Sequence, residues 1–337
     1  MTAIPSEALP LRPLGTTGLQ VHALCWGCAA LGSMPDAFTY SVAEAQALTT
    51  LRALLDGPVN FLDTAAAYGD GESERRLGIA LRARGGVPAG FVLATKADRD
   101  LATGEFSGAQ VRRSVERSLR LLGLDCLPLC YLHDPEHIGF EAAMAPGGPV
   151  AALRQCQAEG LVAHIGVAGG PIPMMVRFVE TGLFAAAISH NRYTLLNTSA
   201  DRFFTTCVRH GVAAINGAPY GSGILAKGPG GFARYAYQEA PADVLERARR
   251  LEAICARHGV PLAAAALQFS LRDPRIVSTI VGVSRPERLE QTLALARQPL
   301  PDGLWAEIAA VAPASEDPEA RRWPGAPGSG SRSGSMG

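Results

Sequence analysis

The sequence lacks a net charge, because its 31 lysines and arginines balance its 31 aspartates and glutamates. This balance gives no electrostatic reason to expect a nucleic acid or a membrane as partner. No run of about 18 apolar residues is free of breakers, so no membrane span is expected. The first residues, MTAIPSEALPLRPLG, have no basic segment followed by an apolar core and therefore do not resemble a secretory signal. We expect a cytoplasmic protein.

The seven cysteines do not form the pattern of a disulfide framework, since most of them lie inside apolar runs. They resemble small core residues in a reducing compartment. Cys126, Cys130 and His133 have the spacing of metal ligands, but on a regular strand the first two face one side and the third faces the other. Cys25 and Cys28 have redox-motif spacing without a clear helix start after them. We therefore predict no metal site.

What the sequence does contain is a long alternation of strand-like and helical segments. Its 337 residues are 47% hydrophobic and 18% charged, a composition typical of a chain with a large core. Eight strand-like runs separated by helical patterns predict an α/β fold, a (β/α)8 TIM barrel, as one domain over residues 11–312. The runs cover residues 21–27, 59–63, 91–96, 126–133, 162–167, 185–191, 212–216 and 276–282.

The segments around these runs carry more local signals. Turn residues in LRPLGTTGLQ (11–20) predict a short N-terminal hairpin that closes the bottom of the barrel. Ser107 and Gln110 form a capping-box pattern for a helix that ends at Gly123, and a second helix is predicted over 242–258. Residues 313–337 are rich in Gly, Ser and Pro, and we expect a disordered C-terminal tail there.

Four polar side chains stand at or just past the ends of apolar runs: Asp63, Tyr68, Lys96 and His133. Singly, each has an ordinary structural explanation, such as a turn cap, a solvated strand end or a core histidine. Together, on successive strands of a parallel barrel, they would meet at the carboxyl ends, where barrel enzymes place their active sites. This arrangement predicts a catalytic site.

The chemistry that needs this set is proton transfer to or from an alcohol or carbonyl oxygen. The pKa of a free tyrosine is about 10, so a neighbouring ammonium is needed to favour the phenolate near neutral pH. Lys96 would supply that charge, and Asp63 would offset the cost of burying it. His133 could donate a hydrogen bond to the substrate oxygen. The group contains no hydride donor, so a redox reaction would require a cofactor.

Over residues 11–312 the sequence resembles the aldo-keto reductases. The motifs NFLDTAAAYGDGESERRLG, LATKAD, LHDPE, GLVAHIGV and APYGSGILAKG occur in the order found in that family. The resemblance implies a barrel with a nicotinamide cofactor, NAD or NADP, extended across its mouth. It also implies that Asp63, Tyr68, Lys96 and His133 are the catalytic four, with Tyr68 as the acid or base.

For the cofactor contacts the sequence matches the family pattern at some positions and departs from it at others. Asn191 matches the amide that holds the nicotinamide carboxamide, whereas the Ser-Asn pair usual after the fifth strand is Ala168-Gly169 here, and the stacking aromatic residue is Gly217. A lysine that often binds the 2′-phosphate is replaced by Gly282, which leaves the choice between NAD and NADP open. Arg288 matches an arginine of the family, but it is equally compatible with an exposed position on a surface helix. The expected cofactor contacts are Gly27, Cys28, Asp63, Asn191, Ala218, Tyr220, Ser222, Gly282, Ser284 and Arg288.

These departures and LHDPE resemble the aldose 1-dehydrogenase branch, which implies oxidation of a sugar such as L-fucose, L-galactose or D-arabinose at C1 to the lactone. The alternatives are another alcohol or carbonyl, such as pyridoxal or a simple aldehyde, and a cofactor-binding regulatory subunit with vestigial catalysis. Sugar contacts are expected from loops 28–42, 134–148 and 227–240. The candidate substrate residues are Trp26, Tyr68, His133 and Arg192. The sequence does not indicate an oligomeric state.

Overall fold

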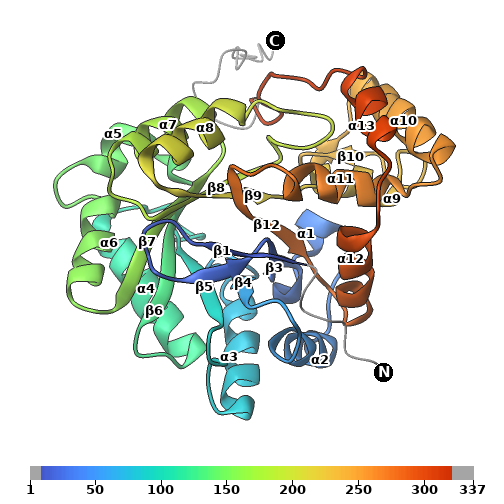
Figure 1. The fold of residues 1–337 in the computed structure, drawn as a ribbon. Helices are drawn as coiled ribbons and strands as arrows, with labels where there is room; N and C mark the ends of the chain where they lie inside the picture. The colour runs from blue at the N-terminus through green and yellow to red at the C-terminus, as the bar shows by residue number, and fades with distance from the viewer. Residues whose placement is uncertain (1–8, 321–337) are drawn as a thin grey trace, which may run out of the picture.

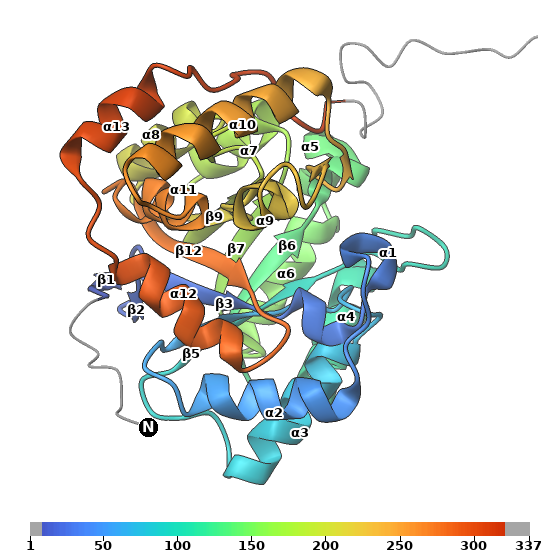
Figure 2. The same cartoon turned by 90° about the vertical axis from the view of Figure 1, so that its right-hand side faces the viewer.

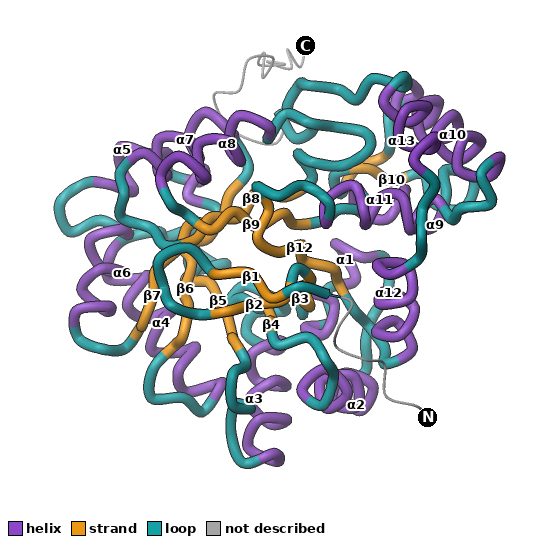
Figure 3. The backbone as a smooth tube through the Cα atoms, in the orientation of Figure 1, coloured by secondary structure: helices purple, strands orange, loops and turns teal. Residues whose placement is uncertain are grey.

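The computed structural model describes residues 9–320 and contains a closed barrel of eight parallel strands. Helices surround the ring of strands on its outside, as Figure 1 shows. The strands are β3 (Leu24–Gly27), β4 (Phe61–Asp63), β5 (Val92–Ala97), β6 (Leu127–His133), β7 (Val162–Gly169), β8 (Ala186–His190), β9 (Ala213–Gly217) and β12 (Ile276–Gly282). Each strand pairs with its neighbour in this order, and β12 closes the ring on β3. The predicted (β/α)8 barrel is confirmed, and all eight predicted runs contribute a strand (Figure 3).

The helices follow the strands along the chain. They are α1 (Pro35–Phe38), α2 (Glu44–Leu55), α3 (Glu72–Arg84), α4 (Gly108–Leu122), α5 (Gly139–Met144), α6 (Pro149–Ala158), α7 (Ile172–Glu180), α8 (Asp201–His210), α9 (Ile224–Lys227), α10 (Ala242–Arg257), α11 (Leu262–Leu271), α12 (Glu287–Arg297) and α13 (Asp302–Ala309). A two-stranded hairpin, β10 (Arg234–Tyr235) with β11 (Gln238–Glu239), lies in the long loop after β9.

At the start of α4, one of the two hydrogen bonds of the predicted capping box is present. The Ser107 hydroxyl accepts a hydrogen bond from the Gln110 backbone N–H at 3.1 Å, as the capping-box pattern predicts. The second half of the box is absent, because the Gln110 Oε1 accepts from the Arg113 guanidinium at 3.0 Å and the Gln110 Nε2 donates to the Asp98 carbonyl oxygen. Gly123 ends the helix in the left-handed conformation.

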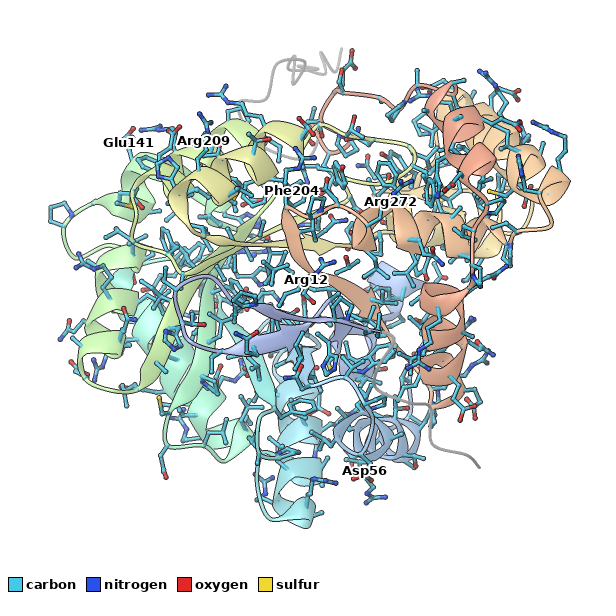
Figure 4. The ribbon with its side chains drawn as sticks, viewed as in Figure 1. Arg12, Asp56, Glu141, Phe204, Arg209 and Arg272 are labelled. Carbon is cyan, nitrogen blue, oxygen red and sulfur yellow. The ribbon has the colours of Figure 1, made fainter. Side chains whose placement is uncertain are left out.

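The N-terminal hairpin closes one end of the barrel, as predicted. Its strands β1 (Leu11–Pro13) and β2 (Gln20–His22) pair antiparallel, and Figure 2 places them at the opposite end of the barrel from α1. Arg12 reaches from the hairpin to the Leu271 carbonyl oxygen at 3.0 Å and to that of Ile276 (Figure 4). Leu14 and Val21 are fully buried and join the inward-facing strand residues, so the bottom is plugged by apolar side chains. The strand residues of this inner cluster are Cys25, Phe61, Val92, Ala94, Leu129, Tyr131, Ala168, Ala186, Ile188, Ala213 and Ile215.

The prediction of a disordered tail is wrong for residues 313–320. Residues 313–320 pack on the domain: the Ala314 N–H donates to the Leu196 carbonyl oxygen, and the Thr198 N–H donates to the Ala314 carbonyl oxygen. Glu319 is fully buried. Composition alone was misleading here, because a few specific polar contacts order a segment that has little apolar surface. Residues 321–337 lie outside the described residues.

The structure can be compared with the sequence predictions about disulfides, metal sites and membrane spans. Six of the seven cysteines are buried and none is in a disulfide. Cys130 packs in the outer apolar cluster between strands and helices, and no group of three potential metal ligands occurs within residues 9–320. No helix in this range has the length and hydropathy needed to cross a bilayer.

Gly78 on α3 is expected to be intolerant of any side chain. A Cβ at this position would lie 1.9 Å from the Leu121 carbonyl oxygen of α4. We expect Gly78→Ala to lower the free energy of unfolding by about 1–3 kcal/mol, because backbone must move to relieve the overlap. Urea denaturation checks this. Gly230→Ala is the matched control, since its Cβ would meet nothing within 4 Å; equal stabilities of the two variants would contradict the prediction.

Candidate active site

Lys96 is the centre of a buried group at the carboxyl ends of β4 and β5. Its Nζ donates to Asp63 Oδ1 at 2.5 Å, to the Thr64 carbonyl oxygen at 2.8 Å and to Tyr68 Oη at 3.1 Å. Asp63 and Lys96 are only 3% and 2% exposed, so water cannot replace these contacts. Three of the four predicted catalytic residues therefore form one hydrogen-bonded unit.

The backbone explains why these groups meet. Asp63 is paired with Ala94 in the ladder between β4 and β5, and Lys96 lies two residues further on the same face of β5. Tyr68 follows β4 on a loop that packs closely on Gly32: a Cβ on Gly69 would lie 2.0 Å from the Gly32 carbonyl oxygen. Gly69 also has a φ of +62°. Only glycine combines this close approach with that backbone conformation, so Gly69 fixes the position of its neighbour Tyr68.

The electrostatics of Lys96 and Tyr68 differ in one respect from the sequence prediction. Burial lowers the pKa of Lys96, but Asp63 and Tyr68 outweigh it, so the pKa is raised and the ammonium stays charged. Burial raises the pKa of Tyr68, and Lys96 opposes this effect without overcoming it. Lys96 thus acts in the expected direction, yet the net shift of the Tyr68 pKa is upward, and the phenol is the resting form at neutral pH.

His133 ends β6 and joins the site through its ring. Its ring centroid lies 5.9 Å from that of Tyr68, in a T-shaped arrangement. Its Nδ1 is 2.6 Å from Asp98 Oδ1, and its Nε2 is 3.7 Å from Asp134 Oδ1. Burial lowers the pKa of His133, but the two carboxylates outweigh it and the pKa is raised. Asp98 was not predicted from the sequence.

Three of the expected cofactor residues share an unusual backbone conformation. Asn191, Ala218 and Ser222 have φ values of +59°, +54° and +64°. Such strain in non-glycine residues is uncommon and clusters at ligand sites. The Ser222 hydroxyl donates to Asn191 Oδ1 at 3.3 Å and accepts from the Tyr237 N–H at 3.0 Å. Asn191 and Ser222 are therefore brought together at the ends of neighbouring strands.

The second expected cofactor segment, after β12, lies beside the first. The charge of Arg288 acts on the half-buried Tyr220 phenol, and β9 pairs with β12. Arg288 and Gly282 are exposed, while Ser284 is half-buried. The exposed guanidinium at the start of α12 and the hydroxyl of Ser284 could bind a phosphate group.

Several predicted contacts are not placed at the mouth. Trp26 is fully buried in the outer cluster between strands and helices, as is Cys28. They alternate along the chain with Cys25, which faces the barrel interior. Gly27 does allow a close approach, but the approaching group is the Ile280 side chain of β12, which would lie 2.9 Å from a Cβ placed on Gly27. Arg192 is fully buried and pairs with Asp317 and Glu319, so it is not available to a substrate. These contacts join residues that are far apart in the chain, so they could not be predicted from the sequence.

His190 and Glu319 are functional candidates that the sequence analysis missed. His190 ends β8 beside Gly217, where a Cβ would lie 3.2 Å from the His190 Cβ. Its Nε2 is 3.3 Å from Glu319 Oε1. Glu319 also accepts a hydrogen bond from Asn191 Nδ2 at 2.9 Å. His190 had a readable signal, because it follows the inward-facing Ala186 and Ile188 in alternation; Glu319 had none.

The comparison with protein families decides the identity of the fold family. The model of the Aldo/keto reductase family matches residues 23–313. The chain belongs to the aldo/keto reductase family. It is therefore an oxidoreductase, from a family whose members use NAD(P)H as cofactor.

Among curated aldo/keto reductase relatives, the chain is 33% identical to D-threo-aldose 1-dehydrogenase of a Pseudomonas species, with 87% of this chain and 94% of the relative covered. It is 31% identical to pyridoxal 4-dehydrogenase of Microbacterium luteolum, with 90% and 97% covered. It is 29% identical to L-galactose dehydrogenase of Arabidopsis thaliana, with 85% and 88% covered.

A solved aldo-keto reductase from Bacillus halodurans, in its holo form, superposes with a TM-score of 0.74. The two chains are 22% identical, and the match covers 93% of this chain and 99% of the other. This similarity supports the barrel fold over the matched part of the chain.

Proposed function

We propose that this aldo/keto reductase oxidises an aldose such as L-fucose, L-galactose or D-arabinose at C1 to the lactone. The observation that carries the proposal is the buried unit in which Lys96 Nζ bonds both Asp63 and the Tyr68 hydroxyl. The names of the D-threo-aldose and L-galactose dehydrogenases support a sugar as substrate.

The polar residues at the mouth fit a nicotinamide cofactor. Asn191 is fully buried and its amide already contacts Glu319 and Ser222, but the amide keeps a second N–H and a second acceptor position. These and the Ser222 hydroxyl would hold the nicotinamide half, while Ser284 and Arg288 would bind the phosphates. Tyr220 and Ala218 would line the path between them. When bound, the oxidised cofactor, NAD or NADP, accepts the hydride from C1 of the sugar.

In this proposal each catalytic side chain has a separate task. Tyr68 would be the general base in its phenolate form, which is the minor form at neutral pH, and would then accept the proton of the C1 hydroxyl. Lys96 favours the phenolate by its charge, and Asp63 holds Lys96 in place and keeps it charged. His133 binds the reacting oxygen and orients it.

Oxidation of pyridoxal is the alternative with a specific observation behind it, the 31% identity to pyridoxal 4-dehydrogenase. A simple aldehyde reduced at the same site would use the same proton chemistry in reverse. A regulatory subunit with vestigial catalysis is disfavoured by the intact hydrogen-bonded unit around Lys96.

A substrate screen tests these functions together. L-fucose, L-galactose, D-arabinose and pyridoxal are each assayed with NAD+ and with NADP+, by the absorbance of the reduced nicotinamide. We expect at least one sugar to be oxidised with a kcat/KM in the range of ordinary enzymes, about 10⁴ M⁻¹s⁻¹ or more. Turnover of pyridoxal alone would support the alternative. Tight cofactor binding without any turnover, of aldehydes included, would favour the regulatory subunit.

A further inference from the structure

Asp98 links the His133 ring to the loop that carries Tyr68 through one buried carboxylate. It follows β5 and is 3% exposed. Its Oδ1 lies 2.6 Å from His133 Nδ1, and its Oδ2 accepts the backbone N–H of Ala67 at 2.8 Å. Ala67 directly precedes Tyr68, so the same carboxylate contacts the imidazole and the loop that carries the phenol.

The neighbouring helix α4 holds Asp98 in this position. The Asp98 N–H donates to the Ser114 hydroxyl at 3.0 Å, and the Gln110 side chain donates to the Asp98 carbonyl oxygen at 3.2 Å. Both Ser114 and Gln110 are buried. A side chain fixed at its backbone and at both carboxylate oxygens is pre-organised, so it can define the orientation and proton position of its partner ring.

The contact with Asp98 decides what the other ring nitrogen of His133 can do. A carboxylate only accepts hydrogen bonds, so Nδ1 must carry a proton. In a neutral imidazole Nε2 would then be an acceptor, and it could not donate to a substrate oxygen. Donation from Nε2 requires the doubly protonated ring, which a buried carboxylate at 2.6 Å stabilises.

We propose that Asp98 is a positioning residue that keeps His133 doubly protonated, so that its Nε2–H donates to the reacting oxygen while the ring adds a positive charge beside Tyr68. The charge stabilises the negative charge that develops on the sugar oxygen as Tyr68 takes its proton. This inference rests on the proposed function for its kinetic consequence, but the state of the ring can be measured without a substrate.

The ionisable groups that act on His133 have charges of opposite sign. Asp98 and Asp134 favour its protonated form, and burial and Lys96 oppose it. His133 acts in turn on Asp63, at the end of β4, and His190, at the end of β8, acts on Asp134. Asp98 is the carboxylate in direct hydrogen-bond contact, whereas Asp134 is 3.7 Å from Nε2. Removal of the Asp98 charge should therefore change His133 more than removal of the Asp134 charge.

The test is nuclear magnetic resonance of ¹⁵N-histidine-labelled protein, with His133→Gln used to assign its signals among the seven histidines. In the wild type we expect a protonated Nδ1 and a His133 pKa above the ordinary value of about 6.5. In Asp98→Asn the His133 pKa should fall by about one unit or more. With the sugar identified by the substrate screen, kcat/KM should fall about a hundredfold, mainly in kcat. Asp98→Glu should recover part of both losses.

Asp125→Asn is the matched control, because Asp125 is exposed and lies before the opposite end of β6; it should leave both measurements unchanged. An unprotonated Nδ1 in the wild type, or an unchanged His133 pKa in a folded Asp98→Asn protein, would overturn the proposal. The wild-type spectrum decides this even if the variant does not fold. If His133 behaves as expected but no sugar is oxidised, the proposed function is wrong and the link between Asp98 and His133 stands.

Discussion

Tyr68→Phe is expected to lower kcat for sugar oxidation by about a hundred- to ten-thousandfold, the range typical of the loss of a general acid or base. The substitution removes one hydroxyl, which lies 3.1 Å from Lys96 Nζ. The ring remains packed against His133, so the pocket keeps its shape. Steady-state kinetics with the best sugar of the screen, and cofactor binding by fluorescence titration, check the prediction.

The Kd for the cofactor should change little in Tyr68→Phe, because the residues proposed to hold the cofactor lie in the segments that follow β8, β9 and β12. Tyr193→Phe is the matched control: it also loses one buried phenolic hydroxyl, but that hydroxyl donates to Asp273, outside the Lys96 unit. The folded control should keep most of its kcat. A Tyr68→Phe enzyme with near-wild-type turnover would show that Tyr68 is not the base.

The barrel could be predicted from the sequence because its signals are local and repeated. Each buried parallel strand appears as a short apolar run, and each run is followed by a helical pattern. The hairpin at the bottom was also readable, from the turn residues between 13 and 20. The half-formed capping box of α4 could not be predicted, because the Gln110 amide contacts the Arg113 guanidinium and the carbonyl oxygen of Asp98, 12 positions earlier in the chain.

The candidate site could be predicted only where a polar residue interrupts an apolar run. Asp63, Lys96 and His133 stand at strand ends, where their polarity is conspicuous. Asp98 follows Lys96 in a polar stretch, and nothing in LATKADRD distinguishes it from the loop residues that follow. Trp26 and Arg192 are candidates for the substrate because they lie near other site residues in the sequence. Their burial depends on side-chain direction for Trp26 and, for Arg192, on a segment more than 120 residues away.

The C-terminal segment is the part of the fold that sequence composition described least well, and its stability depends on Glu319. Burial raises the pKa of Glu319, but His190, Arg192 and Asn191 outweigh it and lower the pKa to about 2. The carboxylate is therefore charged at neutral pH. The stabilisation it provides is present above the ordinary glutamate pKa and is lost as the pH falls toward 2.

Glu319→Gln is expected to lower the free energy of unfolding by about 3 kcal/mol, the lower end of the cost of breaking a buried ion pair. The variant leaves Asp317, at 2.7 Å, as the one charged partner of the buried Arg192 among residues 9–320. Urea denaturation at pH 7 measures the loss. Hydrogen exchange should show faster opening of the Ala314 and Thr198 amides, which tie the segment to the loop after β8. Glu316→Gln, at an exposed position three residues earlier, should change neither.

A double-mutant cycle separates the ion pair from simple loss of packing. Arg192→Met removes the buried charge, so Glu319→Gln should cost less in that background than in the wild type, by about 1 kcal/mol or more. Because Glu319 also accepts the Asn191 amide, the single variant should raise the cofactor Kd if Asn191 holds the nicotinamide as proposed. Strictly additive stabilities would mean that Glu319 acts through Asn191 and His190 and not through Arg192. Unchanged stability in Glu319→Gln would show that the buried charges at this end of the barrel do not hold the segment in place.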